Sequence, residues 1–411
     1  MELKLDFIRQ QFPSLSGPWT FFDNAGGSQT LKHVADRVRD YLLNTNVQLG
    51  GSYEISRISG ERVKQGIHTM TELINAGDDR EIILGSSTTA LIKNLSYSLA
   101  EILDPGDEII VTNCDHEANI GAWRALEKRA IDIKEWRINQ DTLKLDLEDL
   151  ETLMTPKTRL VAVTHTSNIL GTINPIKEIA SFVHERGALI CVGGVAYAPH
   201  GLVDVQELDV DFYAFSLYKV YGPHYSLLYG KKDILEQLPG INHFFLEDEL
   251  PVKFQPAHVN FELCYSLTGI REYFMEVAAY HQPTDSLYPK TLREAAAFSY
   301  KLFAHHEEKL SKKMIEFLNS QSNIQIIGEN QYSRNVRVPT FSFVIDGIKS
   351  STIPTQVDTH LIAIRYGDFY ARRLITDLGL EVHDGVIRVS MVHYNTVEEV
   401  EHLIGILKQI L

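Results

Sequence analysis

The chain has 411 residues, which is longer than a single hydrophobic core usually supports, so we expect two domains. Hydrophobic residues make up 44% of the chain and charged residues 23%, as in ordinary folded proteins, which excludes a disordered chain. The formal net charge is −15. Nucleic acids and anionic membranes attract clustered Lys and Arg, so we expect neither as a partner.

The cysteines and the N-terminal segment indicate the cellular compartment. Cys114, Cys191 and Cys264 lie far apart and form no CxxC pair, so we expect neither a disulfide framework nor a metal site. The N-terminal segment MELKLDFIRQQF mixes acidic and apolar residues and does not resemble a signal or transit peptide. No apolar run approaches the roughly 18 residues of a membrane span. These features predict a cytoplasmic protein.

From Glu81 to Gly230 the chain alternates short apolar runs with helix-like segments. This order predicts a mostly parallel sheet that is covered by helices on both faces. The expected strands are Glu81–Leu84, Glu108–Thr112, Ile131–Trp136, Arg159–Thr164, Ala188–Val192, Phe212–Phe215 and Ser226–Tyr229, and the expected helices include Thr89–Ile102, Ile176–Arg186 and Lys232–Leu238.

The pattern changes after about Asn260 and predicts a smaller α+β domain. Its expected elements are a helical segment at 286–320, strands at Ile324–Ile327, Thr340–Ile345, Leu361–Tyr366 and Val386–Val389, and a last helix that starts at Asn395–Thr396. We therefore expect a large domain at residues 18–260, and a small domain at 261–411 near which residues 1–17 pack.

Lys219 follows the apolar strand Phe212–Phe215 within the segment Ser216-Leu217-Tyr218-Lys219-Val220-Tyr221-Gly222-Pro223. Open α/β sheets bind ligands at the carboxyl ends of their strands. A lysine forms an imine with an aldehyde cofactor, and partial burial lowers its pKa enough to make the amine nucleophilic. Taken alone, the pattern also fits an ordinary surface lysine.

A run of small and hydroxyl residues, Gly85-Ser86-Ser87-Thr88-Thr89, follows another strand and opens a helix. Backbone N–H groups, hydroxyls and the positive end of the helix dipole together can bind a phosphate. A capped helix with a polar turn is the alternative. The spacing is not that of a nucleotide-binding P-loop, which disfavours a nucleoside triphosphate.

Further motifs occur in a fixed order along the chain: Phe21-Phe22-Asp23-Asn24-Ala25, Asp115-His116-Glu117-Ala118-Asn119, His165-Thr166-Ser167-Asn168-Ile169-Leu170-Gly171-Thr172, Pro199-His200, Ile387-Arg388-Val389-Ser390 and His393-Tyr394-Asn395-Thr396. Together with the Lys219 segment they resemble class V pyridoxal-5′-phosphate (PLP) aminotransferases, and within them the cysteine-desulfurase-like branch. The resemblance covers nearly the whole chain.

The resemblance implies the α/β fold of PLP-dependent transferases of fold type I, with a mostly parallel seven-stranded sheet and a homodimer that shares its active sites. It implies PLP as the cofactor and an amino acid as the substrate. The resemblance implies that Lys219 binds the aldehyde and transfers the Cα proton, that His116 stacks on the ring and that Asn168 contacts the phenolic oxygen. It implies phosphate binding by Ser86, Ser87, Thr88 and Ser216. It implies substrate binding by Asn24, Ala25 and Arg388, and the Arg388 guanidinium suits a carboxylate.

The sequence departs from the family at the position of the desulfurases' nucleophilic cysteine. The segment Arg365-Tyr366-Gly367-Asp368-Phe369-Tyr370 places Tyr370 there, and no cysteine follows Cys264. A phenol with a pKa near 10 does not replace a thiolate in accepting a persulfide sulfur. Transfer through an enzyme persulfide is therefore disfavoured, and Tyr370 is either an acid–base group or a wall of the pocket.

Two further departures concern cofactor contacts. The family's Val-Asp-Gly-Ala-Gln reads Val192-Gly193-Gly194-Val195-Ala196, so Gly193 replaces the aspartate that pairs with the pyridine nitrogen, and Ala196 replaces the glutamine. Without that carboxylate the pyridinium is less favoured and the ring withdraws electrons less well. His258, in Ala257-His258-Val259-Asn260, takes a place from which the family reaches the partner subunit's phosphate.

We expect a PLP-dependent enzyme that acts on an α-amino acid by cysteine or cystine C–S lyase chemistry, or by a desulfurase-like β-elimination. An aminotransferase and an epimerase or racemase are the alternatives on the same scaffold, because a fold does not fix a reaction. A catalytically impaired PLP-fold binding protein is the alternative of another class, and Gly193 motivates it.

Overall fold

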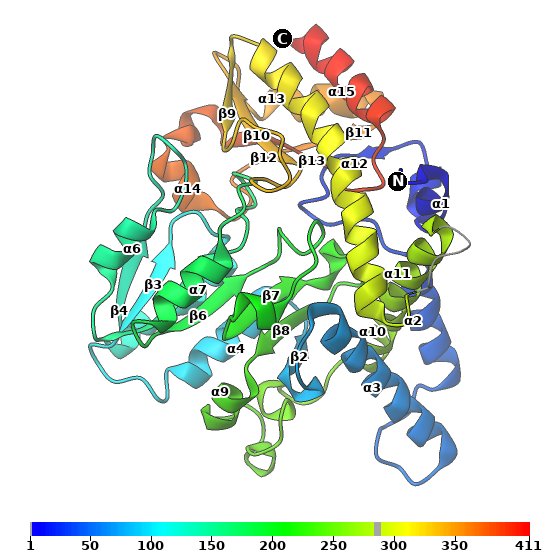
Figure 1. Cartoon of the computed structure of the whole chain (residues 1–411), viewed down its shortest axis with the longest axis vertical. Coiled ribbons are helices and arrows are strands. Elements are labelled where there is room, and N and C mark those ends of the chain that lie inside the picture. Colours follow the sequence, from blue (N-terminus) through cyan, green and yellow to red (C-terminus); the bar gives the residue numbers. More distant parts are fainter. Residues whose placement is uncertain (1, 283–288) are drawn as a thin grey trace.

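The fold is that of a computed structural model, and residues 2–282 and 289–411 are described. Its centre is a seven-stranded sheet (Figure 1). The strands, in order across the sheet, are β2 (Ile82–Gly85), β8 (Ser226–Gly230), β7 (Phe212–Ser216), β6 (Leu189–Gly193), β5 (Thr158–Thr164), β3 (Glu108–Thr112) and β4 (Asp132–Trp136). Strand β8 runs antiparallel to both of its neighbours and the other pairs are parallel. The predicted mostly parallel seven-stranded sheet is confirmed.

Side chains alternate between the two faces of this sheet, as the period of two along a strand requires. In β5, Val161 and Val163 join one hydrophobic core, and Leu160 and Ala162 join the other. The first core is covered by α2 (Lys32–Asn44), α3 (Glu54–Ile74), α6 (Leu147–Leu153), α7 (Ile176–His184), α8 (Val205–Leu208), α10 (Phe261–Ser266), α11 (Thr268–His281) and the first half of α12 (Leu292–Ser320); the second is covered by α4 (Thr88–Leu99), α5 (Gly121–Arg124) and α9 (Lys232–Gln237).

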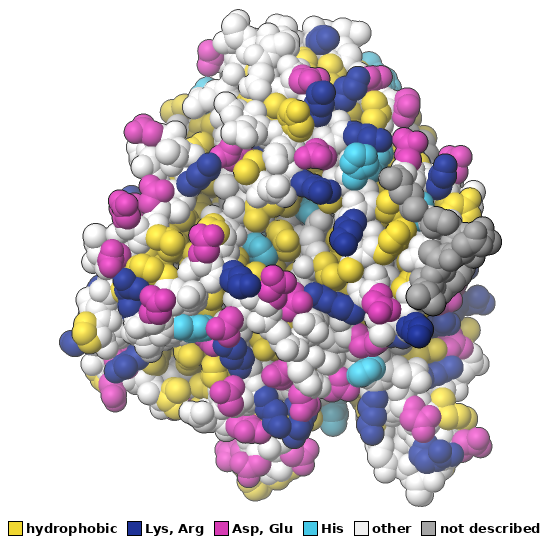
Figure 2. All heavy atoms as spheres, viewed as in Figure 1, with side chains coloured by type: hydrophobic (Ala, Val, Ile, Leu, Met, Phe, Trp, Pro, Cys, Tyr) yellow, Lys and Arg dark blue, Asp and Glu magenta, His cyan; other side chains and the backbone are white. Residues whose placement is uncertain are grey.

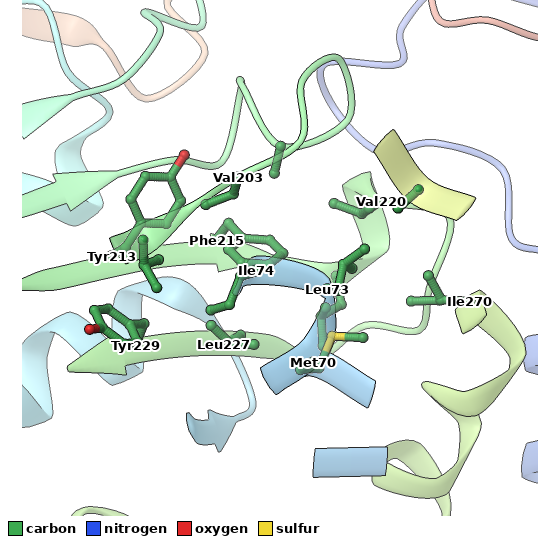
Figure 3. Close-up of a cluster of buried hydrophobic side chains, with 14 of the residues drawn as sticks. Met70, Leu73, Ile74, Val203, Tyr213, Phe215, Val220, Leu227, Tyr229 and Ile270 are labelled. Carbon is green, nitrogen blue, oxygen red and sulfur yellow. The ribbon is translucent and has the colours of Figure 1, made fainter. Parts of the chain in front are cut away.

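The close-up of the first core shows how β7 is anchored (Figure 3). Tyr213 and Phe215 of β7 and Leu227 of β8 lie against Leu73 and Ile74 of α3, and all five are almost completely buried. Burying a side chain of this size stabilises the fold by about 1.5–3 kcal/mol. The strand that leads to Lys219 is therefore held rigidly.

The small C-terminal sheet is antiparallel, in the order β12 (Arg365–Gly367), β13 (Val386–Ser390), β10 (Thr340–Ile345) and β9 (Ile324–Ile327). The second half of α12, α13 (Thr352–Val357) and α15 (Val397–Ile410) cover one face. As expected, α15 starts after Thr396, which forms a capping box with Glu399.

Two sequence-based boundaries in this region are changed by the structure. The single strand expected at Leu361–Tyr366 is wrong: it splits into β11 (Ile362–Ala363), which pairs in parallel with β1 (Thr20–Phe21), and β12, which joins the small sheet. Part of the helical segment expected from residue 286 lies outside the described residues, and α12 begins after its N-cap Thr291.

The N-terminal helix α1 (Leu5–Gln10) lies beside α11 (Figure 1). The rings of Phe7 and Tyr280 stack with their centroids 4.0 Å apart, and Arg9 forms a 2.8 Å ion pair with Glu399. Helices α10 and α11 pack against α2 and α3. The domain boundary expected at residue 260 stays a prediction.

The remaining described elements are short. They are α14 (Arg372–Asp377) and the 3₁₀ helices η1 (Pro13–Ser16), η2 (Asp79–Glu81), η3 (Glu117–Asn119), η4 (Ala125–Arg129), η5 (Leu217–Lys219), η6 (Phe244–Leu246), η7 (Val252–Phe254), η8 (Asp358–His360) and η9 (Leu380–His383).

Acidic and basic side chains are intermixed on the face seen in Figure 2. The three cysteines are free and buried. Among the described residues, no helix is both long and apolar enough to cross a membrane.

Candidate functional site

A cavity lies at the carboxyl edge of the large sheet, where open α/β sheets bind their ligands. Thr164, Gly193 and Ser216, the last residues of β5, β6 and β7, all line it. The full lining is Ser87, Thr88, Thr89, Ile92, Asp115, His116, Ala118, Asn119, Thr164, Thr166, Asn168, Gly193, Val195, Ala196, Ser216, Tyr218 and Lys219. Eight of the residues predicted from the sequence are thus brought together: Ser87, Thr88, His116, Asn168, Gly193, Ala196, Ser216 and Lys219.

Lys219 ends η5, directly after β7, and only 7% of it is exposed. The turn is fixed because the Leu217 N–H donates to the Tyr225 carbonyl at 2.9 Å and the Val220 N–H donates to Leu217 at 2.9 Å. Burial, and secondly the positive charge of Arg388, lower the pKa of Lys219 to about 7. A large fraction of this amine is therefore neutral and nucleophilic near pH 7.

A cluster of hydroxyl groups lies where α4 begins. Thr88 Oγ1 is 2.8 Å from Ser216 Oγ and 3.3 Å from Ser226 Oγ, which joins the start of α4 to the ends of β7 and β8. Ser87 is the N-cap and accepts from the Ala90 N–H at 3.1 Å. The N-terminus of this 12-residue helix and its hydroxyls suit a phosphate. Ser86 is exposed and lies outside the cavity lining.

His116 follows β3 and caps η3, with its Nδ1 accepting from the Ala118 N–H at 3.1 Å. The ring proton is therefore held on Nε2. Burial, followed by the charges of Lys219 and Arg388, lowers the pKa of His116 to about 4, so the imidazole is neutral near pH 7. Tyr370 lies outside the cavity lining and is 71% exposed, with its ring centroid 5.2 Å from that of His116.

Arg388 of β13 is buried and lies near the cavity without lining it. Its Nη2 is 3.0 Å from Asp23 Oδ1, its Nη1 donates to the Asn168 carbonyl at 3.3 Å, and its guanidinium lies 3.7 Å above the centre of the Phe369 ring. Burial lowers the pKa of Arg388 to about 10, so the side chain remains charged at pH 7.

Several buried polar atoms in or near the cavity lack a hydrogen-bond partner among the described residues. Arg388 Nε, Asn168 Oδ1 and Thr166 Oγ1 have no hydrogen-bond partner within residues 2–282 and 289–411. Asn168 Nδ2 is already used, since it donates to the Phe369 carbonyl at 2.9 Å. Buried polar groups are seldom left unpaired, so these atoms fit a site that binds a polar molecule.

Three further predicted residues, besides Ser86, Tyr370 and Arg388, lie outside the cavity lining. Asn24 is buried and its Nδ2 donates to the carbonyls of Phe21 at 2.9 Å and Ser390 at 3.0 Å. The Ala25 N–H donates to Ser390 Oγ at 2.8 Å. These bonds fix the turn that carries Asp23 beside β13. His258 is exposed on a loop.

Sequence reasoning gave no role to the polar residues Asp115, Asn119 and Thr164, which also line the cavity. A signal for Asp115 was present, because it follows β3, and parallel strands end at the same edge of a sheet. Asp115 is 4% exposed, and burial raises its pKa to about 7.

The groups that line the cavity fit PLP. A partly neutral amine suits its aldehyde, a hydroxyl-lined helix start suits its phosphate, and a neutral imidazole and a buried carboxyl group suit its ring. Lys219, Thr88, Ser216, His116 and Asp115 supply these groups.

Comparisons with known proteins agree with this chemistry. The family described as "Aminotransferase class-V" matches residues 20–244 and 290–403. The chain is 46% identical over 419 residues to the "Aminotransferase-like protein FGM3" of Gibberella zeae, covering 99% of this chain and 98% of that protein. It is 33% identical over 414 residues to the "Cysteine desulfurase-like protein ustD" of Aspergillus flavus, covering 97% of this chain and 88% of that protein.

Solved structures share the fold. The cysteine desulfurase CsdA of Escherichia coli has a TM-score of 0.83 and is 24% identical, with 100% of this chain and 98% of that chain covered. The cysteine desulfurase of Thermococcus onnurineus has a TM-score of 0.85 and is 22% identical, with 100% and 98% covered.

Proposed function

The chain belongs to the class-V aminotransferase family, whose cofactor is PLP, and on that premise we propose that it is a lyase for α-amino acids. The bond that breaks joins Cβ to its leaving group, and cysteine and cystine are the proposed substrates. The single observation that carries the proposal is a cavity whose lining holds an amine for a Cα proton but no thiol, with a buried arginine next to the lining residue Asn168.

Lys219 and Arg388 have separate roles: the lysine transfers the Cα proton and the arginine binds the α-carboxylate. When bound, PLP supplies an aldehyde for the amino group and a ring that accepts electrons from Cα. Arg388 binds the α-carboxylate through its guanidinium, whose Nε is unpartnered among the described residues. With its pKa lowered to about 7, the Nζ of Lys219 takes the Cα proton near neutral pH.

The cysteines argue against transfer of sulfur to the protein. All three lie within the described ranges, none lines the cavity, and each is at most 1% exposed. Burial raises the pKa of Cys114 and of Cys264 to about 12, and it raises the pKa of Cys191 further. These residues therefore offer no thiolate to accept a substrate's sulfur.

The proposed reaction of cysteine balances with water as the only co-reactant. The Cα–H and Cβ–S bonds break, a Cα–Cβ double bond forms, and sulfur leaves with the electron pair of the Cβ–S bond. Lys219 takes the Cα proton, and protonation of sulfur gives hydrogen sulfide. Water then converts the resulting enamine into pyruvate and ammonia.

Product analysis tests this function. The purified holoprotein is incubated with cysteine or cystine, and pyruvate, sulfide and alanine are quantified, with the Lys219→Ala variant as the control. We expect pyruvate and sulfide in equal amounts from cysteine, and no turnover in the variant. Alanine as the main product would indicate desulfuration, and a 2-oxo acid formed only with an added amino acceptor would indicate transamination. Either result would overturn the lyase proposal.

We also propose that two chains associate and that His258 reaches the partner's cofactor phosphate. The supporting observations are that His258 is exposed and that Phe244 and Phe245 of η6 are 83% and 64% exposed. Sedimentation equilibrium should give a mass of two chains. His258→Ala should weaken the binding of PLP but not that of pyridoxal, which lacks the phosphate. A wild-type protein that sediments as a monomer, or a His258→Ala variant that binds PLP as tightly as the wild type, would contradict the proposal.

A further inference from the structure

Asp115 extends from the end of β3 towards the end of β6, where the family's aspartate is replaced by Gly193. A Cβ atom placed on Gly193 would lie 3.4 Å from Asp115 Oδ2, 3.5 Å from Asp115 Oδ1 and 3.2 Å from Asn119 Nδ2. The space that a side chain at position 193 would enter is thus occupied by the carboxyl group of Asp115.

The Asp115 carboxyl group is held in one orientation. The His116 N–H donates to Oδ1 at 2.7 Å, and Asn119 Nδ2 donates to Oδ2 at 2.7 Å. Asn119 is itself fixed, because its Oδ1 accepts from Trp123 Nε1 at 3.2 Å. Two carboxylate oxygens offer about four acceptor sites, so Asp115 can accept a further hydrogen bond from a molecule in the cavity.

Asp115 also lacks a positive partner among the described residues. Its surroundings supply burial, which raises its pKa, and hydrogen bonds from Asn119 and His116, which lower it, but no cation. A buried carboxylate without a cation is unfavourable. A cationic group bound in the cavity would therefore be stabilised by Asp115, and PLP carries such a group in its pyridinium nitrogen.

We propose that Asp115 binds the protonated pyridine nitrogen of PLP and so takes the place of the aspartate that the family carries at position 193. The carboxylate comes from β3 instead of β6, and it reaches the same space because both strands end at the same edge of the sheet. This role makes Asp115 a catalytic residue. It holds for any amino-acid substrate, and it removes the reason for regarding Gly193 as a mark of an impaired enzyme.

The protonation of the pyridine nitrogen provides a test that does not depend on turnover. Apoprotein is loaded with PLP that is ¹⁵N-labelled in the ring, and the ¹⁵N chemical shift is measured in the wild type and in Asp115→Asn. We expect the shift of a protonated nitrogen in the wild type and that of an unprotonated nitrogen in the variant. Asp211→Asn, which changes another buried aspartate that directly precedes β7 and lies outside the cavity, should keep the wild-type shift.

A binding cycle separates a direct contact from a merely structural role. The dissociation constants of PLP and of 1-deaza-PLP, whose ring nitrogen is replaced by CH, are measured for wild type and for Asp115→Ala. In the wild type the deaza compound should bind about tenfold more weakly or worse, since a hydrogen bond between charged groups is lost. In Asp115→Ala the two compounds should bind with nearly equal affinity.

The reciprocal variant Asp115→Asn/Gly193→Asp places the carboxylate where the family has it, and it should recover the shift of the protonated nitrogen. Gly193→Asp alone brings two carboxyl groups together and should weaken PLP binding. The proposal would be overturned by an unprotonated nitrogen in the wild type or by a protonated nitrogen in Asp115→Asn. It would also be overturned if Asp115→Ala preferred PLP over its deaza analogue as strongly as the wild type does.

Discussion

Asp23, which follows β1, pairs with Arg388 of β13, with Asp23 Oδ1 3.0 Å from Arg388 Nη2. The Phe369 ring lies beneath the same guanidinium at 3.7 Å. Two of the three guanidinium nitrogens therefore have partners within the described fold, and Nε is left for a ligand. In the proposed function, this fixed planar group binds the carboxylate of the substrate.

Arg388→Lys should weaken substrate binding while the positive charge is kept. An ammonium group cannot reproduce the geometry of the guanidinium, so we expect KM for the amino acid to rise about tenfold or more. Arg365→Lys is the matched control, because Arg365 also pairs with Asp23, at 3.4 Å, but is exposed. Steady-state kinetics of both variants measure the effect. An unchanged KM in Arg388→Lys would remove the carboxylate from this site.

Thr88→Val should weaken the binding of PLP through its phosphate. The substitution keeps the shape of the side chain but removes the hydroxyl that lies 2.8 Å from Ser216 Oγ. Loss of one hydrogen bond to a charged group predicts an affinity for PLP that is about tenfold lower. Pyridoxal is the internal control, and fluorescence titration of apoprotein should show little change in its affinity. Equal losses for both compounds would contradict a phosphate contact.

The capture of the cofactor's aldehyde should depend on pH in a way set by Lys219. Burial lowers the pKa of this lysine from 10.5 to about 7, and only the neutral amine attacks an aldehyde. The rate constant should rise about tenfold per pH unit below pH 7 and level off above it. Stopped-flow absorbance of apoprotein with pyridoxal gives the rate, and N-acetyllysine treated in parallel corrects for ionisation of the aldehyde compound. A rate that continues to rise towards pH 10 would show an ordinary, solvated lysine.

Alanine substitutions at two glycines of α3 should change the free energy of unfolding in opposite directions, because only one of them faces α10. A Cβ on Gly66 would lie 1.9 Å from the Cys264 carbonyl oxygen, so Gly66→Ala should lower the free energy of unfolding by roughly 1–3 kcal/mol. A Cβ on Gly60 of the same helix meets nothing within 4 Å, so Gly60→Ala should raise it by roughly 0.5–1 kcal/mol. Urea unfolding measures both, and a stabilising Gly66→Ala would contradict the described contact.

The large sheet could be predicted from the sequence because most of its strands are buried on both faces and read as apolar runs; the edge strand β4 is the exception. The strand at Glu108–Thr112 was predicted with the bounds that it has in the structure. The region at Leu361–Tyr366 could not be resolved in this way, since its two short strands pair with different sheets, and such pairing depends on distant residues.

The candidate site was predicted where a motif fixes a residue next to a strand end, as for Lys219 and Ser216. Asp115 was missed because it follows β3, whereas the family motif with Gly193 lies at the end of β6. A pattern along one strand does not show which neighbouring side chain fills the space beside Gly193. Ser86 was expected in the lining, but the helix begins so that Ser87 is the N-cap and Ser86 is exposed.

The identity of the lysine that holds PLP tests the account most directly. The holoprotein is treated with borohydride, which reduces the bond between cofactor and lysine, and the digested protein is analysed by mass spectrometry. We predict one pyridoxyl group, carried by Lys219, and no near-visible absorption band in Lys219→Ala. A pyridoxyl group on another lysine, or a band that persists in Lys219→Ala, would contradict the assignment of this cavity as the site of PLP.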